Sequence, residues 1–355
     1  MSSSSSLGEP ILASVEAGGT SFCVSFAPLS SPTTITSTTS IPTTTPAETI
    51  AAVVAVLKQV PYSALGVATF GPAGVDPAKP NYGKILNSPK AAWRGFEILG
   101  PLLAVNPAAP YKFETDVNAP ALSEFKLNKR RGETSCAYIT VGTGVGVGLV
   151  VNGSTVRGLM HPEGGHVPVL QLEGDDFRGY SWGSKAPWLG KGTVESLASS
   201  VAICERLGIE DRDALRSVPD GDPAWDHAAN ALACLVATLA LTVSIERVVM
   251  SGGVMLRPGL MEKVRVRAAE VLNGYVDNFD ADRVIVPSIF GNDAGKVGAL
   301  NLAKEAYEEA RAGGKGDSGG SGGGDRGGGG GWGKVAAFAA VAFGVGVAVG
   351  RGKRY

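Results

Sequence analysis

Asp116 is the residue of this 355-residue sequence best suited to acid–base chemistry. It follows a short strand-like run at 111–115 and precedes a helical stretch that opens at Ala119. Ligands of open α/β folds bind at the carboxyl ends of strands, so Asp116 is expected to lie beside a substrate. A carboxylate there could accept the proton of a reacting hydroxyl group. The alternative is an acid that caps the helix, but Asn118 is the competing cap and would leave Asp116 free.

A second group of polar residues lies on a glycine-relaxed loop. Glu163 and His166 flank two glycines, which brings a carboxylate and an imidazole close together. Charge-assisted hydrogen bonds from such a pair suit the adjacent hydroxyl groups of a sugar. Glu195, at the start of a helical stretch, could add a third contact. The alternatives are a loop histidine without a role and a glutamate that only favours a helix N-terminus.

Three glycine-rich segments could bind phosphate, namely 16–21 (EAGGTS), 142–146 (GTGVG) and 251–255 (SGGVM). Glycine turns and helix N-termini bind phosphate because their backbone N–H groups are unobstructed. One glycine turn alone is weak evidence, but three together suggest a nucleotide clamped between two similar halves of the chain. The sequence contains neither a complete P-loop nor a complete dinucleotide fingerprint.

An α/β pattern that begins with a hairpin positions these residues. Strands are expected within 11–26, on either side of a glycine turn, and at 34–40, 64–69, 111–115, 136–141 and 146–151. Helices are expected at 46–60, 119–128, 194–207, 223–242 and 260–273. Asp222 followed by Pro223 is a typical cap and first-turn pair for one of these helices.

Composition favours small-molecule chemistry. The formal net charge is -1 and no stretch dense in Lys and Arg occurs in the body of the chain, so no nucleic-acid partner is expected. Four scattered cysteines form no Cys-x-x-Cys pair and are interpreted as reduced thiols. The N-terminal serines carry no basic and no apolar region, which argues against a signal peptide.

The C-terminal part of the chain departs from average composition. Residues 313–334 form a Gly-rich linker, and 335–350 are uncharged and largely apolar. As a helix, 335–350 would span roughly 24 Å of a hydrocarbon core about 30 Å thick, and snorkelling of Lys334 and Arg351 could cover the deficit. We predict a transmembrane helix that anchors a cytosol-facing body in an organelle membrane. A cytoplasmic protein with a loosely docked tail is the alternative.

Short motifs in a fixed order resemble the fructokinase branch of the ROK (repressor, open reading frame, kinase) family. They are EAGGT at 16, IPTTTP at 41, FGP at 70, NYG at 81, SPK at 88, WRGF at 93, TDVN at 115, GTG at 142, EGGH at 163, ESLAS at 195, GGVM at 252 and GNDAG at 291. The resemblance implies an actin-like ATPase (ribonuclease H-like) α/β fold, with a nucleotide and sugar cleft between two lobes. It also implies transfer of the γ-phosphoryl group of Mg²⁺-ATP to the 6-hydroxyl of a hexose. The small lobe would comprise 10–122 with the helix 294–312 packed back on it, and the large lobe 123–293.

Carried over position by position, the resemblance implies that Asp116 is the catalytic base. Substrate contacts would be Gly71, Thr115, Asn118, Glu163, His166 and Glu195. Contacts to ATP would be Gly18, Gly19, Thr20, Gly142, Thr143, Gly144, Gly252 and Gly253. Thr115 stands where glucokinase-type members carry Asn, which favours fructose over glucose, mannose or an N-acetylhexosamine. A homodimer is also expected.

Two departures from the family pattern matter. Family members hold a structural zinc through the loop histidine and a following Cys and His cluster, whereas 171–193 contains neither residue type. No zinc and no other resident metal site is therefore predicted, and this loop is expected to be held by packing of Trp182 and Trp188. Ser21 replaces the usual lysine beside the first hairpin. These losses leave a second hypothesis open, a weakly catalytic or non-catalytic sugar-binding scaffold at a membrane.

Overall fold

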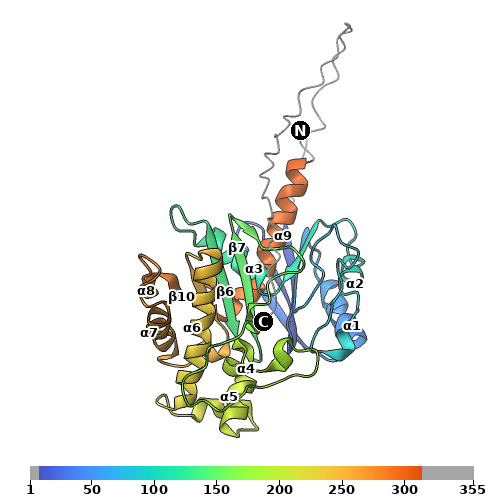
Figure 1. Cartoon of the computed structure of the whole chain (residues 1–355). Coiled ribbons are helices and arrows are strands. Elements are labelled where there is room, and N and C mark those ends of the chain that lie inside the picture. Colours follow the sequence, from blue (N-terminus) through green and yellow to red (C-terminus); the bar gives the residue numbers. More distant parts are fainter. Residues whose placement is uncertain (1–7, 314–355) are drawn as a thin grey trace, which may run out of the picture. The chain divides into compact units, whose positions relative to one another are not determined.

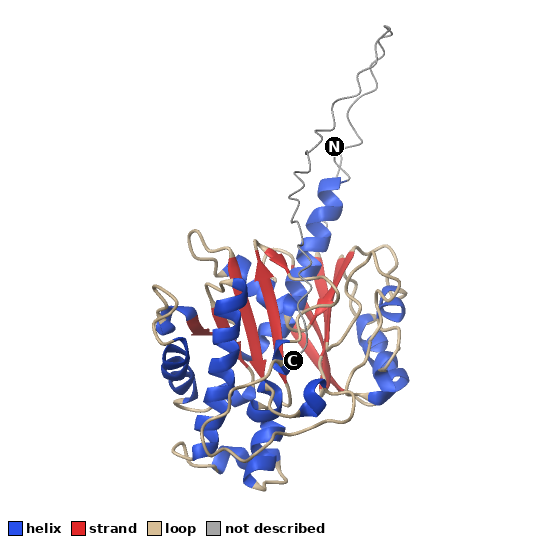
Figure 2. Ribbon diagram, in the orientation of Figure 1, coloured by secondary structure: helices blue, strands red, loops and turns tan. Residues whose placement is uncertain are grey.

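Two five-stranded mixed sheets form the framework of residues 8–313, which are the residues that the computed structural model describes (Figure 2). The first sheet has the order β3 (Ser37–Pro42), β2 (Ser21–Pro28), β1 (Ile11–Ala17), β4 (Ala64–Thr69) and β5 (Tyr111–Thr115). The second has the order β10 (Ile285–Pro287), β9 (Val248–Ser251), β6 (Ser135–Val141), β7 (Val145–Val151) and β8 (Ser154–Thr155).

The two sheets repeat one topology. In the first sheet β1, β2 and β3 pair antiparallel in sequence, and β4 and β5 add in parallel on the other side of β1. In the second sheet β6, β7 and β8 pair antiparallel, and β9 and β10 add in parallel beside β6. The hairpins β1–β2 and β6–β7 therefore occupy equivalent places, which confirms that the chain contains two similar halves.

The described helices are α1 (Pro46–Leu57), α2 (Leu99–Leu103), α3 (Asn118–Leu127), α4 (Val194–Ala198), α5 (Ser200–Leu207), α6 (Pro223–Val243), α7 (Leu260–Leu272), α8 (Ala281–Val284) and α9 (Ala294–Gly313). Side chains close in sequence cap the N-termini of several of these helices. The Asp222 side chain accepts the N–H of Ala224 at the start of α6, as the sequence predicts, and the Thr45 side chain accepts that of Glu48 in α1.

One predicted helix is broken in two. The stretch 194–207 forms α4 and α5, because Ser199 is extended and its hydroxyl accepts the N–H of Ala202 to start a new helix. Thr193 caps α4 in the same way, through a capping box with Ser196. Two caps six positions apart thus specify two short helices where apolar spacing alone predicts one.

Helix α9 runs between the two sheets (Figure 1). Its Leu300 packs with Leu12 and Ala64 of the first sheet, and its Leu302 packs with Ala68 of β4 and Ala119 of α3. Each sheet has its own large apolar cluster, one around β1, β2 and β4 and one around β6, β7 and β9. The described residues 8–313 nevertheless belong to one compact unit, so the predicted lobe boundaries stay a prediction.

Within residues 8–313, helix α6 is long and apolar enough to cross a membrane, but it lies largely buried against the second sheet. The core cluster of that sheet contains its Leu232, Leu235 and Val236. The predicted linker from residue 314 and the predicted transmembrane helix at 335–350 lie outside the described residues. Anchoring, localisation and a homodimer stay predictions from the sequence.

Candidate active site

Asp116 lies in the turn between β5 and α3, where the carboxyl ends of β4 and β5 meet. Its N–H donates to the Thr69 carbonyl at 2.8 Å, and its side chain is partly exposed. Burial raises the pKa of the Asp116 carboxyl to about 7. Among residues 8–313 no cation pairs with this carboxylate. A carboxyl with a pKa near neutrality and an open side is suited to accept a proton from a bound hydroxyl.

The predicted capping role of Asn118 is wrong. Helix α3 begins at Asn118 after Val117, which makes no side-chain cap bond. The Thr115 hydroxyl instead accepts the N–H of Asn118 at 3.0 Å. Asp116 still has no capping role, but Thr115 rather than Asn118 is the reason.

Thr115 and Asn118 are enclosed by protein, with 1 % and 0 % of their surface exposed. The Asn118 amide donates to Glu114 Oε1 at 3.2 Å, and its oxygen accepts the N–H of Leu149 in β7 at 3.1 Å. Its polar atoms are thus used inside the protein, which contradicts the expected sugar contact of Asn118. The Thr115 hydroxyl is equally enclosed, so both residues position the turn that carries Asp116.

Glu163 stands close to several predicted site residues. Its Oε2 lies 3.9 Å from His166 Nε2, and its Oε1 would be 3.0 Å from a Cβ at Gly71. Burial raises the pKa of Glu163 to about 8, and the charges of Glu195 and Asp116 add to the effect. The ends of β4 and β5, the loop around the 3-10 turn at 164–166 and the start of α4 therefore bring five predicted residues together, namely Gly71, Asp116, Glu163, His166 and Glu195.

Glu195 joins this acidic group to the second glycine hairpin. It lies in the first turn of α4, and its Oε2 accepts the N–H of Val145 at 2.9 Å. A Cβ at Gly144 would lie 2.5 Å from the same oxygen, so glycine is required for this close approach. Burial raises the pKa of Glu195, whereas His166 opposes the shift.

His161 lies at the site, although the sequence motifs did not predict a role for it. Its ring is buried, its Nε2 accepts the N–H of Ala73 at 3.0 Å, and its Nδ1 lies 3.1 Å from the Pro162 carbonyl. Nδ1 therefore carries the proton, and burial lowers the pKa of the ring. The neutral His161 ties the loop that carries Glu163 to the loop after Gly71. Only its position two residues before Glu163 could have signalled this.

The two glycine hairpins present equivalent free amides. In the β1–β2 turn Gly18 donates to the Ser21 carbonyl, and in the β6–β7 turn Gly142 donates to the Gly144 carbonyl. Among the described residues, the next two N–H groups of each turn have no protein acceptor. These groups belong to Gly19 and Thr20 in the first turn and to Thr143 and Gly144 in the second. Pairs of adjacent free N–H groups suit phosphate oxygens.

Gly252 and Gly253 follow β9 and begin a short 3-10 helix. Gly252 has a φ of 95°, and a Cβ there would lie 2.4 Å from the Val141 carbonyl. This backbone therefore packs directly against the end of β6, next to the second hairpin.

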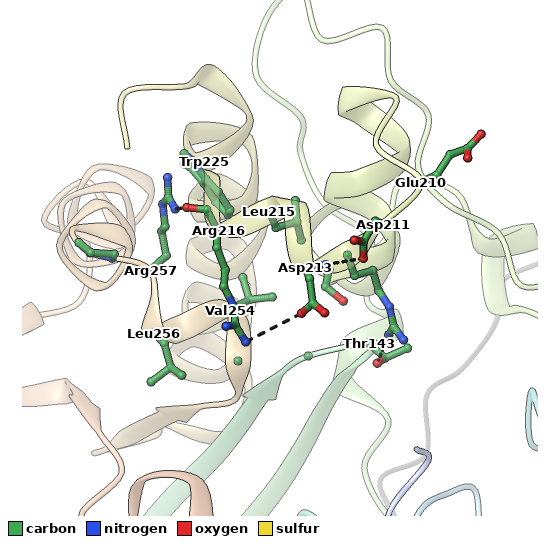
Figure 3. Close-up of a pocket in the computed structure, with 15 residues that line it drawn as sticks. Thr143, Glu210, Asp211, Asp213, Leu215, Arg216, Trp225, Val254, Leu256 and Arg257 are labelled. Atoms are coloured by element: carbon green, nitrogen blue, oxygen red, sulfur yellow. Dashed lines mark hydrogen bonds and ion pairs between the residues drawn. The ribbon is translucent and has the colours of Figure 1, made fainter. Parts of the chain in front are cut away.

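A cavity of about 740 Å³ opens beside the second hairpin (Figure 3). Thr143 and Gly253 line it, together with Trp225 of α6 and Arg257. The Arg257 guanidinium stacks 4.6 Å from the Trp225 ring centroid, and Arg212 donates to the Thr143 hydroxyl at 2.7 Å. Its size, the Trp225 ring and the two arginines suit a nucleoside.

Glu16 is a second residue at the site that was not among the site residues predicted from the sequence. It lies at the end of β1, and burial raises its pKa to about 7, with Asp116 adding to the effect and Lys296 opposing it. Its Oε1 would lie 1.9 Å from a Cβ at Gly295, so it packs on the first turn of α9. Within residues 8–313 its carboxylate has no ion-pair partner, and no group of three or more acids, histidines or cysteines could hold a metal. Carboxylate oxygens are the ligands that Mg²⁺ prefers, and one or two suffice when phosphates complete the shell.

The loop 171–193 is held by an ion cluster rather than by two tryptophans. Asp175 accepts from both terminal nitrogens of Arg206, at 2.7 and 2.9 Å, and His227 Nδ1 lies 3.1 Å from it. The Arg206 guanidinium also stacks 4.6 Å from the Phe177 ring centroid. Trp188 is 65 % exposed, so its predicted packing role is wrong.

Trp182 does contact the site, since its ring centroid lies 6.4 Å from that of His166. The loop held by Asp175 thus reaches one of the predicted sugar contacts.

Comparison with known proteins gives matches along most of the chain. The model of the ROK family matches residues 12–306. A fructokinase of Pediococcus pentosaceus is 35% identical over 84% of this chain and 100% of its own length, and a fructokinase of Zymomonas mobilis is 33% identical over 82% and 96%.

Solved structures show the same fold at lower identity. A ROK hexokinase from Thermus thermophilus has a TM-score of 0.63 at 24% identity, over 86% of this chain and 100% of its own. A ROK family glucokinase from Streptomyces griseus, in complex with glucose and AMPPNP, has a TM-score of 0.63 at 23% identity, over 84% and 100%. The predicted α/β, actin-like ATPase fold is confirmed.

Proposed function

This chain belongs to the ROK family and is a sugar kinase, and we propose that it transfers the γ-phosphoryl group of ATP to the 6-hydroxyl of fructose. The observation that carries the proposal is the position of Asp116. A carboxyl with a pKa raised to about 7 lies beside a group of polar side chains suited to a sugar, at the strand ends.

The proposed reaction needs one base and an aligned donor. Asp116 accepts the proton of the sugar hydroxyl while the oxygen of that hydroxyl forms a bond to the γ-phosphorus. The bond from that phosphorus to the bridging oxygen of the β-phosphate breaks, and ADP leaves with the electron pair. A base with a pKa near 7 is about half ionised at neutral pH, and its carboxylate form is basic enough to take the proton.

Sugar binding in this proposal falls to Glu163, His166 and Glu195. Their carboxylate and imidazole groups can accept from and donate to neighbouring hydroxyls. Gly71 leaves room opposite Glu163, since a side chain there would lie within 3.0 Å of its carboxylate. Thr115 and Asn118 act indirectly, by fixing the turn that holds Asp116.

Nucleotide binding falls to the two hairpins and the cavity beside the second one. The free amides of Gly19, Thr20, Thr143 and Gly144 would bind phosphate oxygens, and the cavity near Trp225 would take the nucleoside. Glu16 is the carboxylate that would hold Mg²⁺ together with those oxygens, and the ion when bound would offset phosphate charge.

Fructose is proposed over other hexoses because the fructokinases of Pediococcus pentosaceus and Zymomonas mobilis align along almost their whole length. The test is ATP-coupled turnover over fructose, glucose, mannose and N-acetylmannosamine, compared by kcat/KM. Fructose should exceed the other sugars by at least about 10-fold. A higher kcat/KM for another hexose would make that hexose the substrate in place of fructose. Absence of turnover on every sugar tested would contradict the proposed phosphoryl transfer.

A further inference from the structure

Lys90 lies over the tip of the first glycine hairpin. Its ε-carbon is 3.6 Å from the position that a Cβ at Gly19 would take, on a side that glycine leaves open. Its ammonium nitrogen is one bond further along. The amides of Gly19 and Thr20, which have no protein acceptor within the described residues, belong to the same turn. A cation and two free N–H groups thus share one small region.

The Lys90 ammonium is not used by the protein itself. Across residues 8–313 it has no carboxylate within 4.0 Å and no hydrogen-bond acceptor. Lys79, Lys112 and Lys296, by contrast, each pair with a carboxylate. An ammonium group is a compact, strongly hydrated charge that suits phosphate oxygens.

The turn that carries Lys90 is firmly anchored. The Lys90 N–H donates to the hydroxyl of the buried Ser88 at 3.2 Å, and its carbonyl accepts the N–H of Trp93 at 3.0 Å. The Trp93 indole is 1 % exposed and donates to the Thr44 carbonyl at 3.0 Å. The backbone from which the Lys90 side chain projects is therefore fixed.

An aromatic cluster links this turn to both halves of the reaction site. The Trp93 ring lies 5.3 Å from that of Phe22, just after the hairpin, and 5.5 Å from that of Phe70, just before Gly71. Contacts of this kind fix the relative positions of the three segments. Lys90 is thus held in register with the phosphate hairpin and the sugar loop together.

The hairpin itself contributes no basic side chain, because residues 18–21 are Gly, Gly, Thr and Ser. The nearby Lys296 is paired with Asp293. We propose that Lys90 is a catalytic residue whose ammonium contacts the γ-phosphoryl group of ATP while that group passes to the sugar. This inference rests on the proposed kinase function and adds to it the group that offsets phosphoryl charge from the side of the first hairpin.

The role is electrostatic. Lys90 keeps its protons and forms no covalent bond, since Asp116 takes the hydroxyl proton and ADP takes the electrons of the broken bond. Negative charge on the oxygens of the transferring group is stabilised by a cation that is already in place. Removing it should therefore slow transfer more than it weakens sugar binding.

The test compares Lys90→Met and Lys90→Arg with Lys84→Met. Lys84 is an exposed lysine six residues before Lys90, and it provides the control for loss of one positive charge. For Lys90→Met we expect kcat to fall about 100-fold, with the sugar KM within about threefold of wild type. Lys90→Arg should recover at least about a tenth of the lost activity, because it restores the charge in another shape. Lys84→Met should leave kcat unchanged.

A binding measurement separates this inference from the kinase assignment. Calorimetric affinities for AMPPNP and ADP, each with Mg²⁺, are compared in the wild type and in Lys90→Met. The variant should lose about 10-fold in AMPPNP affinity and keep its ADP affinity. Equal losses for both nucleotides, or a kcat within threefold of wild type, would overturn the role of Lys90. If no sugar is turned over by any form, the proposed function fails, and the difference between AMPPNP and ADP still decides whether Lys90 contacts the γ-phosphoryl group.

Discussion

Glu195 Oε2 accepts the N–H of Val145 at 2.9 Å, so one carboxylate faces the sugar group and holds the second phosphate hairpin. Its other oxygen is left for a substrate hydroxyl or for His166. The proposed sugar and nucleotide sites would therefore share the Glu195 side chain.

Replacement of Glu195 should affect both substrates. Glu195→Ala removes the acceptor of Val145, so we expect KM for the sugar and for ATP each to rise by about 10-fold or more. Glu195→Gln keeps a neutral acceptor and should raise mainly the sugar KM. Steady-state kinetics in both substrates measure this, and equal effects of the two variants on the ATP KM would contradict the shared role.

Activity should depend on pH through Asp116. Its carboxyl must be ionised to accept a proton, so kcat/KM should fall roughly tenfold per pH unit below about 7. The Glu163→Gln variant should show the same fall in kcat/KM below about pH 7, although its kcat/KM is lower than that of wild type at every pH. An acidic limb near pH 4 in the wild type would mean that the base is a group with an ordinary carboxyl pKa.

The raised pKa of Asp116 makes rising pH favour activity but lower the stability of the folded protein. A carboxyl with a raised pKa binds its proton more tightly in the folded than in the unfolded protein, so Asp116 lowers stability as pH rises from about 4 to 7. Asp116→Asn should therefore lose less stability than wild type between pH 5 and pH 8, and melting temperatures at the two pH values measure the difference. An unchanged difference would mean that the pKa of Asp116 is not raised.

Asp175 should be a strong determinant of stability. Its side chain is 4 % exposed, and Asp175→Asn leaves Arg206 without its ion partner, so we expect a loss of about 3 kcal/mol in the free energy of unfolding at pH 7. The Arg206 hydrogen bonds hold the pKa of Asp175 far below its usual range. The loss should therefore shrink as pH falls below about 4, where the unfolded carboxyl protonates. Urea unfolding at pH 7 and at pH 3.5 gives both values.

Asp226→Asn is the matched control, because Asp226 lies in α6 next to His227, pairs with Lys263 and is half exposed. A loss for Asp175→Asn no greater than for this control would show that the ion cluster does not hold the loop.

Metal removal should not destabilise the protein. The loop 171–193 is fixed by Asp175 and Arg206, and the sequence there has no cysteine or histidine to bind zinc. The melting temperature after dialysis against EDTA should match that of untreated protein. A fall of several degrees that zinc reverses would contradict the predicted absence of a structural zinc.

Local patterns allowed much of the framework to be predicted from sequence. The strand at 111–115, the helix after Asp222 and the two glycine hairpins follow from short-range spacing and caps. Asn118 was misassigned because its partners Glu114 and Leu149 come together only when β5 and β7 pack around α3.

Long-range partners explain the other misses. Asp175 meets Arg206 and His227 across the fold, and no spacing in the sequence signals that cluster. Glu16 reads as an ordinary acid at the end of a strand until α9 and Asp116 enclose it.

The role of Asp116 as the base is measured by single-turnover phosphoryl transfer from ATP to fructose in Asp116→Asn, with fructose and AMPPNP affinities determined on the same sample. If Asp116 is the base, the rate should fall by about 10²- to 10⁴-fold while both affinities stay within about threefold of wild type. A variant that binds both ligands and transfers the phosphoryl group at the wild-type rate would show that another residue accepts the proton.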